Sequence, residues 1–278
     1  MFRLCSDWVI SGQMVPLRSQ SGFSLVELSI VLVILGLLTG GILGGQALIR
    51  AAELRAVSTE YSRYTTAVQT FRDKYFALPG DMSNATAFWG IAGGSGSVHH
   101  TACRTAVTVP GHPGTCRGDG TSILEHNGAG DARLFWEHLR LSGLVDGAFY
   151  PWSFGNNNAV TGTHVPASKI GDQAGWFACH TASGNFGRPA RNMFVLTSAP
   201  WSTSVCSGGL SAGINAPEAW GIDTKMDDGL ATTGMMTARN SYNAQTDCLT
   251  ENWGLETEAS QYELNRTVPS CHLYFVLN

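Results

Sequence analysis

Positive charge is scarce in this 278-residue chain, which has three lysines and a net charge of −4. The few basic residues do not gather into a stripe. Because nucleic-acid binding depends mainly on neutralising phosphates, this scarcity argues against nucleic acid as the main partner. Phosphate-binding loops of the Walker type and Cys-x-x-Cys pairs are also missing, so the sequence does not indicate a nucleotide hydrolase or a zinc ribbon.

Ionisable side chains are missing from a long segment near the N-terminus. Apart from Glu27, none occurs between Gly22 and Ile49. An apolar run of this length can span a membrane as a helix. A carboxylate within such a span costs roughly 2.5–3.5 kcal/mol on insertion scales, which favours a functional role for Glu27. The alternative is a residue near the membrane interface, where water and the positive end of the helix stabilise its charge.

The residues around Glu27 resemble a known processing signal. Gly22-Phe23 followed by Ser24-Leu25-Val26-Glu27-Leu28 is similar to the class III signal of type IV pilins and pseudopilins. The resemblance implies that residues 1–22 are a leader, that prepilin peptidase cuts after Gly22, and that Phe23 is then N-methylated. It also implies that Glu27 meets the amine of a neighbouring subunit and sets the axial stagger of a filament.

Charge pairing gives this arrangement a physical reason. Cleavage would leave an amine on Phe23 that is close to cationic at neutral pH. An amine and a carboxylate are each costly in hydrocarbon when unpaired and tolerable when paired. Glu27 also lies about one helical turn from Phe23 of its own chain, so pairing within one subunit remains an alternative.

An amphipathic pattern follows the apolar run. Apolar or aromatic residues recur at alternating steps of three and four, which predicts a helix that buries one face. No proline occurs between Phe23 and Leu78, and Pro79-Gly80-Asp81 predicts the end of a helix on the order of 80 Å long. The face should pack on the protein's own head, with a coiled-coil dimer as the alternative. It consists of Leu54, Val57, Tyr61, Tyr64, Val68, Phe71 and Tyr75.

Glycines interrupt the apolar part of this helix at positions 36, 40, 41, 44 and 45. Each lowers helix stability by about 1 kcal/mol relative to alanine in water. Many members of the resembled family have proline where Gly44 stands, and that segment often unwinds in the assembled filament. Two hypotheses follow: local melting between Gly40 and Gly45, or close packing of helices at small residues.

The predicted organisation is a transmembrane and assembly helix over 23–45, its amphipathic continuation over 46–78, and one globular head over 79–278. Helices are expected over 131–141 and 217–225, and long surface loops over 90–120 and 155–168. Short strand patterns occur at 175–179, 192–197 and 271–277. This order predicts an α+β fold in which the long helix packs on an antiparallel sheet, the lollipop architecture that the resemblance implies.

Cysteines suggest disulfides in an exported head. Cys5 lies in the predicted leader, and six cysteines remain, which allow 15 connectivities. We favour sequential pairing, because each bridge then closes a loop of modest length; partly free, buried cysteines are the alternative. The last pair resembles the C-terminal disulfide loop of many type IV pilins. The expected pairs are Cys103–Cys116, Cys179–Cys206 and Cys248–Cys271.

Metal and ligand sites are weakly indicated. No cofactor is expected, but Asp223, Asp227 and Asp228 precede a glycine and could hold calcium, as acidic loops do in some pseudopilin heads. The blander interpretation is a turn that caps a helix end. His99, His100, Cys103, His112 and Cys116 could hold zinc, although their spacing is atypical. Trp136, Trp152, Trp176, Trp201, Trp220 and Trp253 could line a sugar-binding surface but are more typical of a core.

The function expected from these observations is assembly and not catalysis. The chain is predicted to be a structural subunit of a type IV pilus-like filament, anchored once in the bacterial inner membrane with its head in the periplasm. Its expected partners are prepilin peptidase, the inner-membrane assembly platform, and copies of itself or other pilins. A type II secretion pseudopilin is the alternative within the family. A membrane-anchored periplasmic enzyme or sugar-binding module is the alternative from another class.

Overall fold

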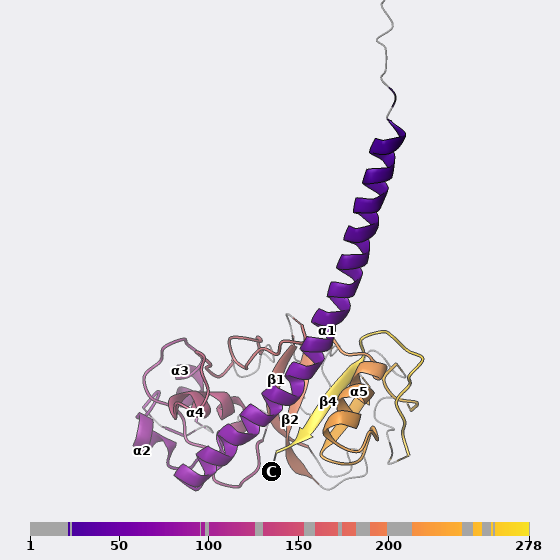
Figure 1. Ribbon diagram of the computed structural model, residues 1–278. Coiled ribbons are helices and arrows are strands. Elements are labelled where there is room, and N and C mark those ends of the chain that lie inside the picture. The colour runs from indigo at the N-terminus through magenta and orange to yellow at the C-terminus, as the bar shows by residue number, and fades with distance from the viewer. Residues whose placement is uncertain are drawn as a thin grey trace, which may run out of the picture. The chain divides into compact units, whose positions relative to one another are not determined.

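The computed structural model describes residues 22, 24–94, 96–97, 100–125, 130–152, 159–171, 174–181, 190–198, 213–240, 247–251, 257 and 259–277. Within them, one long helix is followed by short helices and then by four strands, with helix α5 between the second and third strands (Figure 1). The helices are α1 (Leu25–Tyr75), α2 (Ala85–Trp89), α3 (Thr101–Ala106), the 3-10 helix η1 (Asp131–Arg133), α4 (Phe135–Leu141) and α5 (Ala216–Met226). The strands are β1 (Ala174–Thr181), β2 (Arg191–Ser198), β3 (Met236–Asn240) and β4 (Cys271–Val276).

The chain divides into two compact units, residues 1–48 and 49–278, so helix α1 contributes to both. Its start and end agree with local chemistry. Ser24 precedes the first turn and accepts a hydrogen bond from the amide of Val26 through its side chain. At the other end Phe76 adopts a positive φ of 54°, which breaks the helix before Pro79.

The described strands form one antiparallel sheet in the order β1-β2-β4-β3. Its central strands are rich in aromatic and branched residues, and Phe194 of β2 lies opposite Phe275 of β4. All six residues of β4 are buried. The long helix, the antiparallel sheet and the disulfides confirm the expected α+β class.

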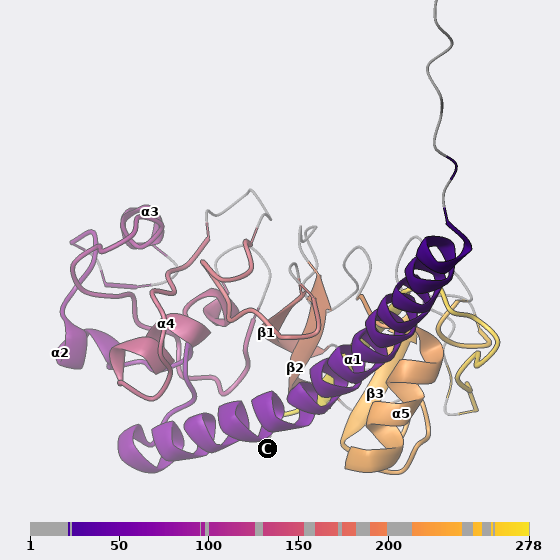
Figure 2. The ribbon, with the colours of Figure 1, turned by 45° about the horizontal axis from the view of Figure 1, so that its top comes forward.

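Helix α1 packs on this sheet through its second half, which crosses the strands in both views (Figures 1 and 2). The ring of Tyr61 stacks on Phe275 with centroids 5.0 Å apart, and its hydroxyl donates to the carbonyl of Val276 at 3.0 Å. Tyr64 meets Trp136 and Trp176 edge to face. The predicted stripe is therefore the face that joins the helix to its own head; five of its seven residues are fully buried, and Leu54 and Tyr75 partly so.

A polar clamp secures the beginning of this packed half. The guanidinium of Arg50 forms a two-pronged contact with Glu218 of α5, with Nε–Oε1 and Nη2–Oε2 distances of 2.6 and 2.8 Å. Its other hydrogen bonds go to Glu53 and to the carbonyls of Ile170 and Gly213. Glu218 also closes a capping box with Asn215, so the same carboxylate starts α5 and holds α1.

Disulfides link Cys103 to Cys116 and Cys248 to Cys271, with Cα atoms 5.9 and 5.0 Å apart. Both are among the sequential pairs expected from the sequence. Cys179 is disulfide-bonded as well, but its expected partner, Cys206, lies outside the described residues.

The segment 90–120 is more ordered than the surface loop expected from its glycines. It contains helix α3 and a small second core around the Cys103–Cys116 bridge. Ala92, Val107 and Leu134 complete that core, so the apolar residues scattered through the segment override its loop-like composition.

Other elements differ from expectation in smaller ways. The helix expected over 131–141 begins as η1 and continues as α4, with Leu134 between them. Strand β3 and helix α2 were not expected. Strand β3 reads Met-Thr-Ala-Arg-Asn, which lacks a periodic apolar pattern, and it forms because its backbone pairs with β4.

Candidate functional site

Glu27 lies at the N-terminal end of α1, where its carboxylate caps the helix. Its Oε2 accepts a hydrogen bond from the backbone amide of Ser24 at 2.8 Å. The side chain of Ser24 in turn accepts from the amide of Val26 at 3.3 Å. This reciprocal arrangement is close to a capping box, and it fixes the carboxylate beside the residue that follows Phe23.

Residues 25–48, the described helical part of this first unit, offer an apolar surface. One helix, α1, is long and apolar enough to cross a membrane, with a mean hydropathy of 2.4 in its most apolar window and none of that window buried. Leu25 and Leu37 are 85% and 73% exposed. An exposed apolar surface of this kind is typical of a segment that meets lipid or another protein.

Comparison with known proteins finds a match at this end of the chain. A family model described as the prokaryotic N-terminal methylation motif matches residues 17–43. The chain carries the signature of type IV pilins and pseudopilins. No curated protein and no solved structure gives a significant match. The match covers the predicted cleavage point, Glu27 and most of the apolar run. It does not extend into the head.

The matched segment contains Gly22, Phe23 and Glu27, the residues expected to be processed or to guide assembly. Gly22 is exposed, and a side chain at its Cα would meet no other atom within 4 Å, so the predicted cut site is sterically open. Phe23 lies outside the described residues. The cleavage position, the methylation of Phe23 and the pairing of Glu27 with an amine stay predictions.

The five glycines of the apolar run lie in continuous helix, and none has an atom within 4 Å of the position its Cβ would take. In the single chain, this segment is therefore not melted. Thr39 bonds back to the carbonyl of Leu35 at 2.8 Å, so its hydroxyl is satisfied within the helix. The glycines leave a shallow surface on which another helix could approach closely.

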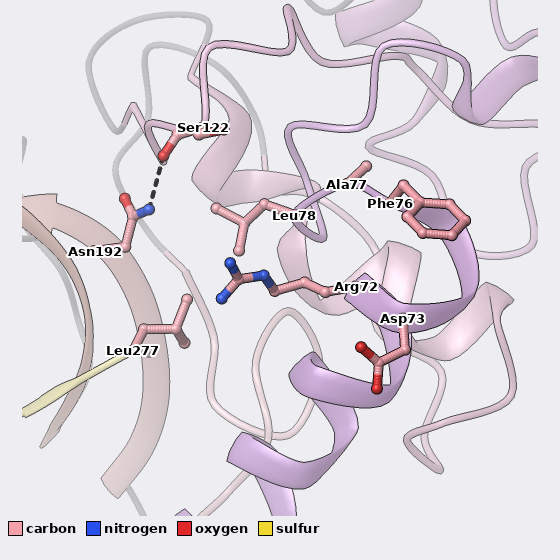
Figure 3. Close-up of a pocket in the computed structure, with 8 residues that line it drawn as sticks. All are labelled: Arg72, Asp73, Phe76, Ala77, Leu78, Ser122, Asn192 and Leu277. Carbon is pink, nitrogen blue, oxygen red and sulfur yellow. Dashed lines mark hydrogen bonds between the residues drawn. The ribbon is translucent and has the colours of Figure 1, made fainter.

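A hollow of about 720 Å³ lies on the head beside the end of α1 (Figure 3). The Arg72 guanidinium points into it, towards Leu78 and Leu277. Among its described lining residues, the charged side chains are Arg72 and Asp73, and Phe76 is the aromatic one. This set resembles neither a nucleophile with its base nor a stacked aromatic platform for a sugar.

The tryptophans and one short motif also bear on the rival functions. Trp136, Trp152 and Trp176 are core residues, whereas Trp220 is exposed. The other two tryptophans named above, at 201 and 253, lie outside the described residues.

One Gly-x-Ser-x-Gly string, at 209–213, is present in the sequence. Such a string indicates a hydrolase only when a strand leads into it, and residues 209–212 are not described.

Zinc is not supported at the histidine- and cysteine-containing loop. Cys103 and Cys116 are joined to each other and so cannot act as thiolate ligands. His112 Nε2 instead lies 2.8 Å from the buried Glu137 Oε1. His99 lies outside the described residues.

The three aspartates considered for calcium do meet in space. Ligand oxygens of Asp223, Asp227 and Asp228 lie within 4.8 Å of one another. Each carboxylate, however, already accepts two hydrogen bonds. Asp223 accepts from Tyr262 and Gly229, and Asp227 accepts from the amides of Met235 and Met236. Asp228 accepts from Leu230 and Thr233. Burial raises the pKa of Asp223 to about 6. This geometry fits a capped turn, and calcium at this cluster stays a prediction.

A second acidic cluster, Asp81, Asp119 and Asp131, was not expected. Its ligand oxygens also lie within 4.8 Å of one another. Burial and the neighbouring carboxylates raise the pKa of Asp131 to about 8 and that of Asp81 to about 6. The sequence indicated only that Asp81 lies at the end of one helix and Asp131 at the start of another. Their clustering with Asp119 could not be seen, because the three residues come from separate segments.

Proposed function

We propose that the protein is a structural subunit of a type IV pilus-like filament and not an enzyme. The methylation motif over residues 17–43 carries the proposal, together with the exposed apolar run between Leu25 and Leu48, in which Glu27 is the one acid. Prepilin peptidase would cut between Gly22 and Phe23. The inner-membrane assembly platform would then add the subunit to copies of itself or to other pilins. The head would lie in the periplasm before assembly and on the cell surface afterwards.

Two physical terms would drive assembly. Apolar side chains between Leu25 and Leu48 would leave lipid or water for contacts with neighbouring subunits, and glycines would allow the helices to approach closely. The carboxylate of Glu27 would pair with the Phe23 amine of a neighbour. An unpaired charge in the apolar filament core is unfavourable, so only the stagger that pairs these groups would be stable.

Processing is tested by N-terminal mass spectrometry of the native protein. We expect the mature chain to begin with N-methylated Phe23. A protein that keeps Met1, or that is cut elsewhere, would overturn the proposal. A membrane-anchored enzyme or sugar-binding module predicts that substitutions at Gly22 leave the protein functional and that no polymer forms.

Assembly is tested by Glu27→Gln, which keeps the size of the side chain and removes its charge. We expect the amount of subunit in sheared filaments to fall at least about tenfold, because the partner amine then lacks its counter-charge. Asp73→Asn is the matched control, since it removes an exposed carboxylate from the other half of the same helix. Normal filaments from Glu27→Gln would contradict the role of this residue.

A type II secretion pseudopilin is the second candidate, favoured by the clustering of Asp223, Asp227 and Asp228 in an acidic turn. The Cys248–Cys271 bridge near the C-terminus favours a pilus instead. Deletion of the coding sequence separates the two. Loss of surface filaments with normal protein export would support the pilus, whereas exported enzymes retained in the periplasm would support the pseudopilin.

A further inference from the structure

Three separate segments of the head bring aspartates to one point. Asp81 follows the end of α1, Asp119 lies after the Cys103–Cys116 bridge, and Asp131 opens η1. One carboxylate oxygen from each lies within 4.8 Å of the other two. Oxygens that bind one calcium ion, at about 2.3–2.6 Å each from the metal, lie no further apart than about twice that distance, so the three carboxylates are close enough to share an ion.

Glycines make this convergence sterically feasible. A Cβ at Gly80, whose φ is +88°, would lie 2.4 Å from the carbonyl oxygen of Asp131. A Cβ at Gly118 would lie 2.4 Å from the Cα of Asp81. Such contacts are closer than atoms tolerate, so both positions require glycine for the three segments to meet.

Hydrogen bonds fix two of the three carboxylates. Asp81 accepts from the amides of Gly120 at 2.7 Å, Thr121 at 3.1 Å and Ser122 at 2.6 Å. Asp119 accepts from the amide and hydroxyl of Thr121 at 3.1 and 2.8 Å. The loop is therefore folded around Asp81, which orients the acids before any ligand binds.

Asp131 differs from the other two because no hydrogen-bond donor among the described residues reaches its carboxyl group. Its side chain is 1% exposed, and neither carboxylate oxygen has a hydrogen-bond partner in the described part of the chain. The charged groups that act on it are the carboxylates of Asp81, Asp119 and Glu125. Buried polar groups nearly always have partners, so two orphaned oxygens facing two other acids indicate that a partner is to be supplied from outside.

We propose that Asp81, Asp119 and Asp131 bind a divalent cation of the calcium class. The donors are all oxygens, which suits a hard cation and disfavours zinc or copper. The cation would neutralise the crowded carboxylates and give Asp131 its missing partner. Because the ligands come from the end of α1, the 119–122 loop and η1, binding would tie these segments together and stabilise the head.

Calcium-dependent stability of the full-length protein in detergent tests the proposal. After treatment with EDTA, about 1 mM Ca²⁺ should raise the melting temperature by roughly 5 °C, and radioactive calcium should bind in equilibrium dialysis. The same concentration of Mg²⁺ should raise it less, because magnesium demands stricter octahedral geometry. A larger shift with Mg²⁺ would overturn the assignment to calcium, and no shift with no bound calcium would overturn the site.

Variants separate this cluster from the other acidic cluster. Asp131→Asn should lose the calcium-dependent shift, and without calcium it should melt no lower than the wild type, because a buried acid without a hydrogen-bond donor has been replaced by a neutral group of the same size. Asp228→Asn, in the capped turn, is the matched control and should keep the full shift. A shift that persists in Asp131→Asn and disappears in Asp228→Asn would place the cation at the other cluster.

A third variant covers the case in which Asp131→Asn fails to fold. Asp119 is exposed, so Asp119→Asn should fold normally and weaken calcium binding about tenfold. Wild-type affinity in this folded variant would contradict the proposed ligand set.

Discussion

The two halves of α1 have the same secondary structure and opposite surroundings. Between Leu25 and Leu48 the large apolar side chains are exposed, as illustrated by Leu37 and Leu43. Between Leu54 and Tyr75 the large apolar residues lie on one face and are buried or partly buried on the head. The first half is apolar all round, and the second is amphipathic.

This contrast indicates that the two halves of the helix suit different surroundings. The second half finds its partner within the chain, in the aromatic sheet face and in polar anchors such as Arg50 and Glu60. Glu60 accepts hydrogen bonds from Ser168, Lys169 and Trp176. The first half has no such partner among the described residues of its own unit, which agrees with the proposed contacts to lipid or to other subunits. Substitutions in the two halves should therefore affect different properties.

The largest difference is expected for apolar side chains. Phe71→Ala should lower the free energy of unfolding of the head by about 3–5 kcal/mol, because Phe71 is fully buried and contacts Tyr75, Trp89 and His138. Leu37→Ala, in the exposed half, should change it by less than about 0.5 kcal/mol. Urea unfolding followed by tryptophan fluorescence measures both. Equal losses of unfolding free energy in the two variants would mean that both halves of α1 stabilise the head to the same extent.

A smaller effect is expected at the clamp that begins the packed half. Arg50→Lys keeps the charge but loses the two-pronged contact with Glu218, and it should destabilise the head by about 1–2 kcal/mol. This figure allows for the one-third exposure of the Arg50 side chain. Unfolding of Arg50→Lys, Glu218→Gln and the double variant should reveal coupling between the two sites.

Arg63→Gln is the control for the clamp. The guanidinium of Arg63 lies 3.8 Å from Asp146, and both side chains are exposed, so this ion pair should contribute no measurable stability. Additive effects at Arg50 and Glu218, or a loss at Arg63 as large as at Arg50, would show that the clamp is not a special contact.

Local patterns explain which parts of the fold could be predicted from sequence. The apolar run, the 3–4 spacing of the stripe and the Pro79-Gly80 stop define α1, and runs of aromatic and branched residues mark β1, β2 and β4. Each of these signals lies within one segment. Strand β3 has no such signal, because its five residues become a strand through pairing with a segment about 35 residues away.

The same distinction applies to the sites. Gly22, Phe23 and Glu27 lie within one short motif, so sequence alone points to them. Asp223, Asp227 and Asp228 were noticed because they are close in sequence, yet their oxygens already accept hydrogen bonds. The cluster of Asp81, Asp119 and Asp131 depends on three segments that meet only in the folded head, and no local pattern carries that information.

The last prediction concerns the pH dependence of stability, which should depend on His138, a buried residue that contacts only the packed half of α1. The packed half of α1 stacks Phe71 on the ring of His138, with centroids 6.5 Å apart. Nδ1 of His138 accepts from the amide of Gly80, and Nε2 donates to the carbonyl of Cys116, so the buried ring is held neutral. Burial lowers its pKa below the usual value. As the pH falls below about 6.5, the unfolded chain gains a proton on this histidine that the folded chain does not, and stability is lost.

A comparison with His138→Gln isolates this contribution. Glutamine can accept from Gly80 and donate to Cys116 but does not titrate. Between about pH 7.5 and about pH 5.5, the wild type should lose about 1.4 kcal/mol of unfolding free energy relative to His138→Gln. Carboxyl groups with raised pKa values, such as Asp223, act in the opposite direction in both proteins and cancel in the difference. Parallel pH profiles in urea would mean that His138 accepts its proton in the folded head, and that the packed half of α1 rests on a surface able to ionise.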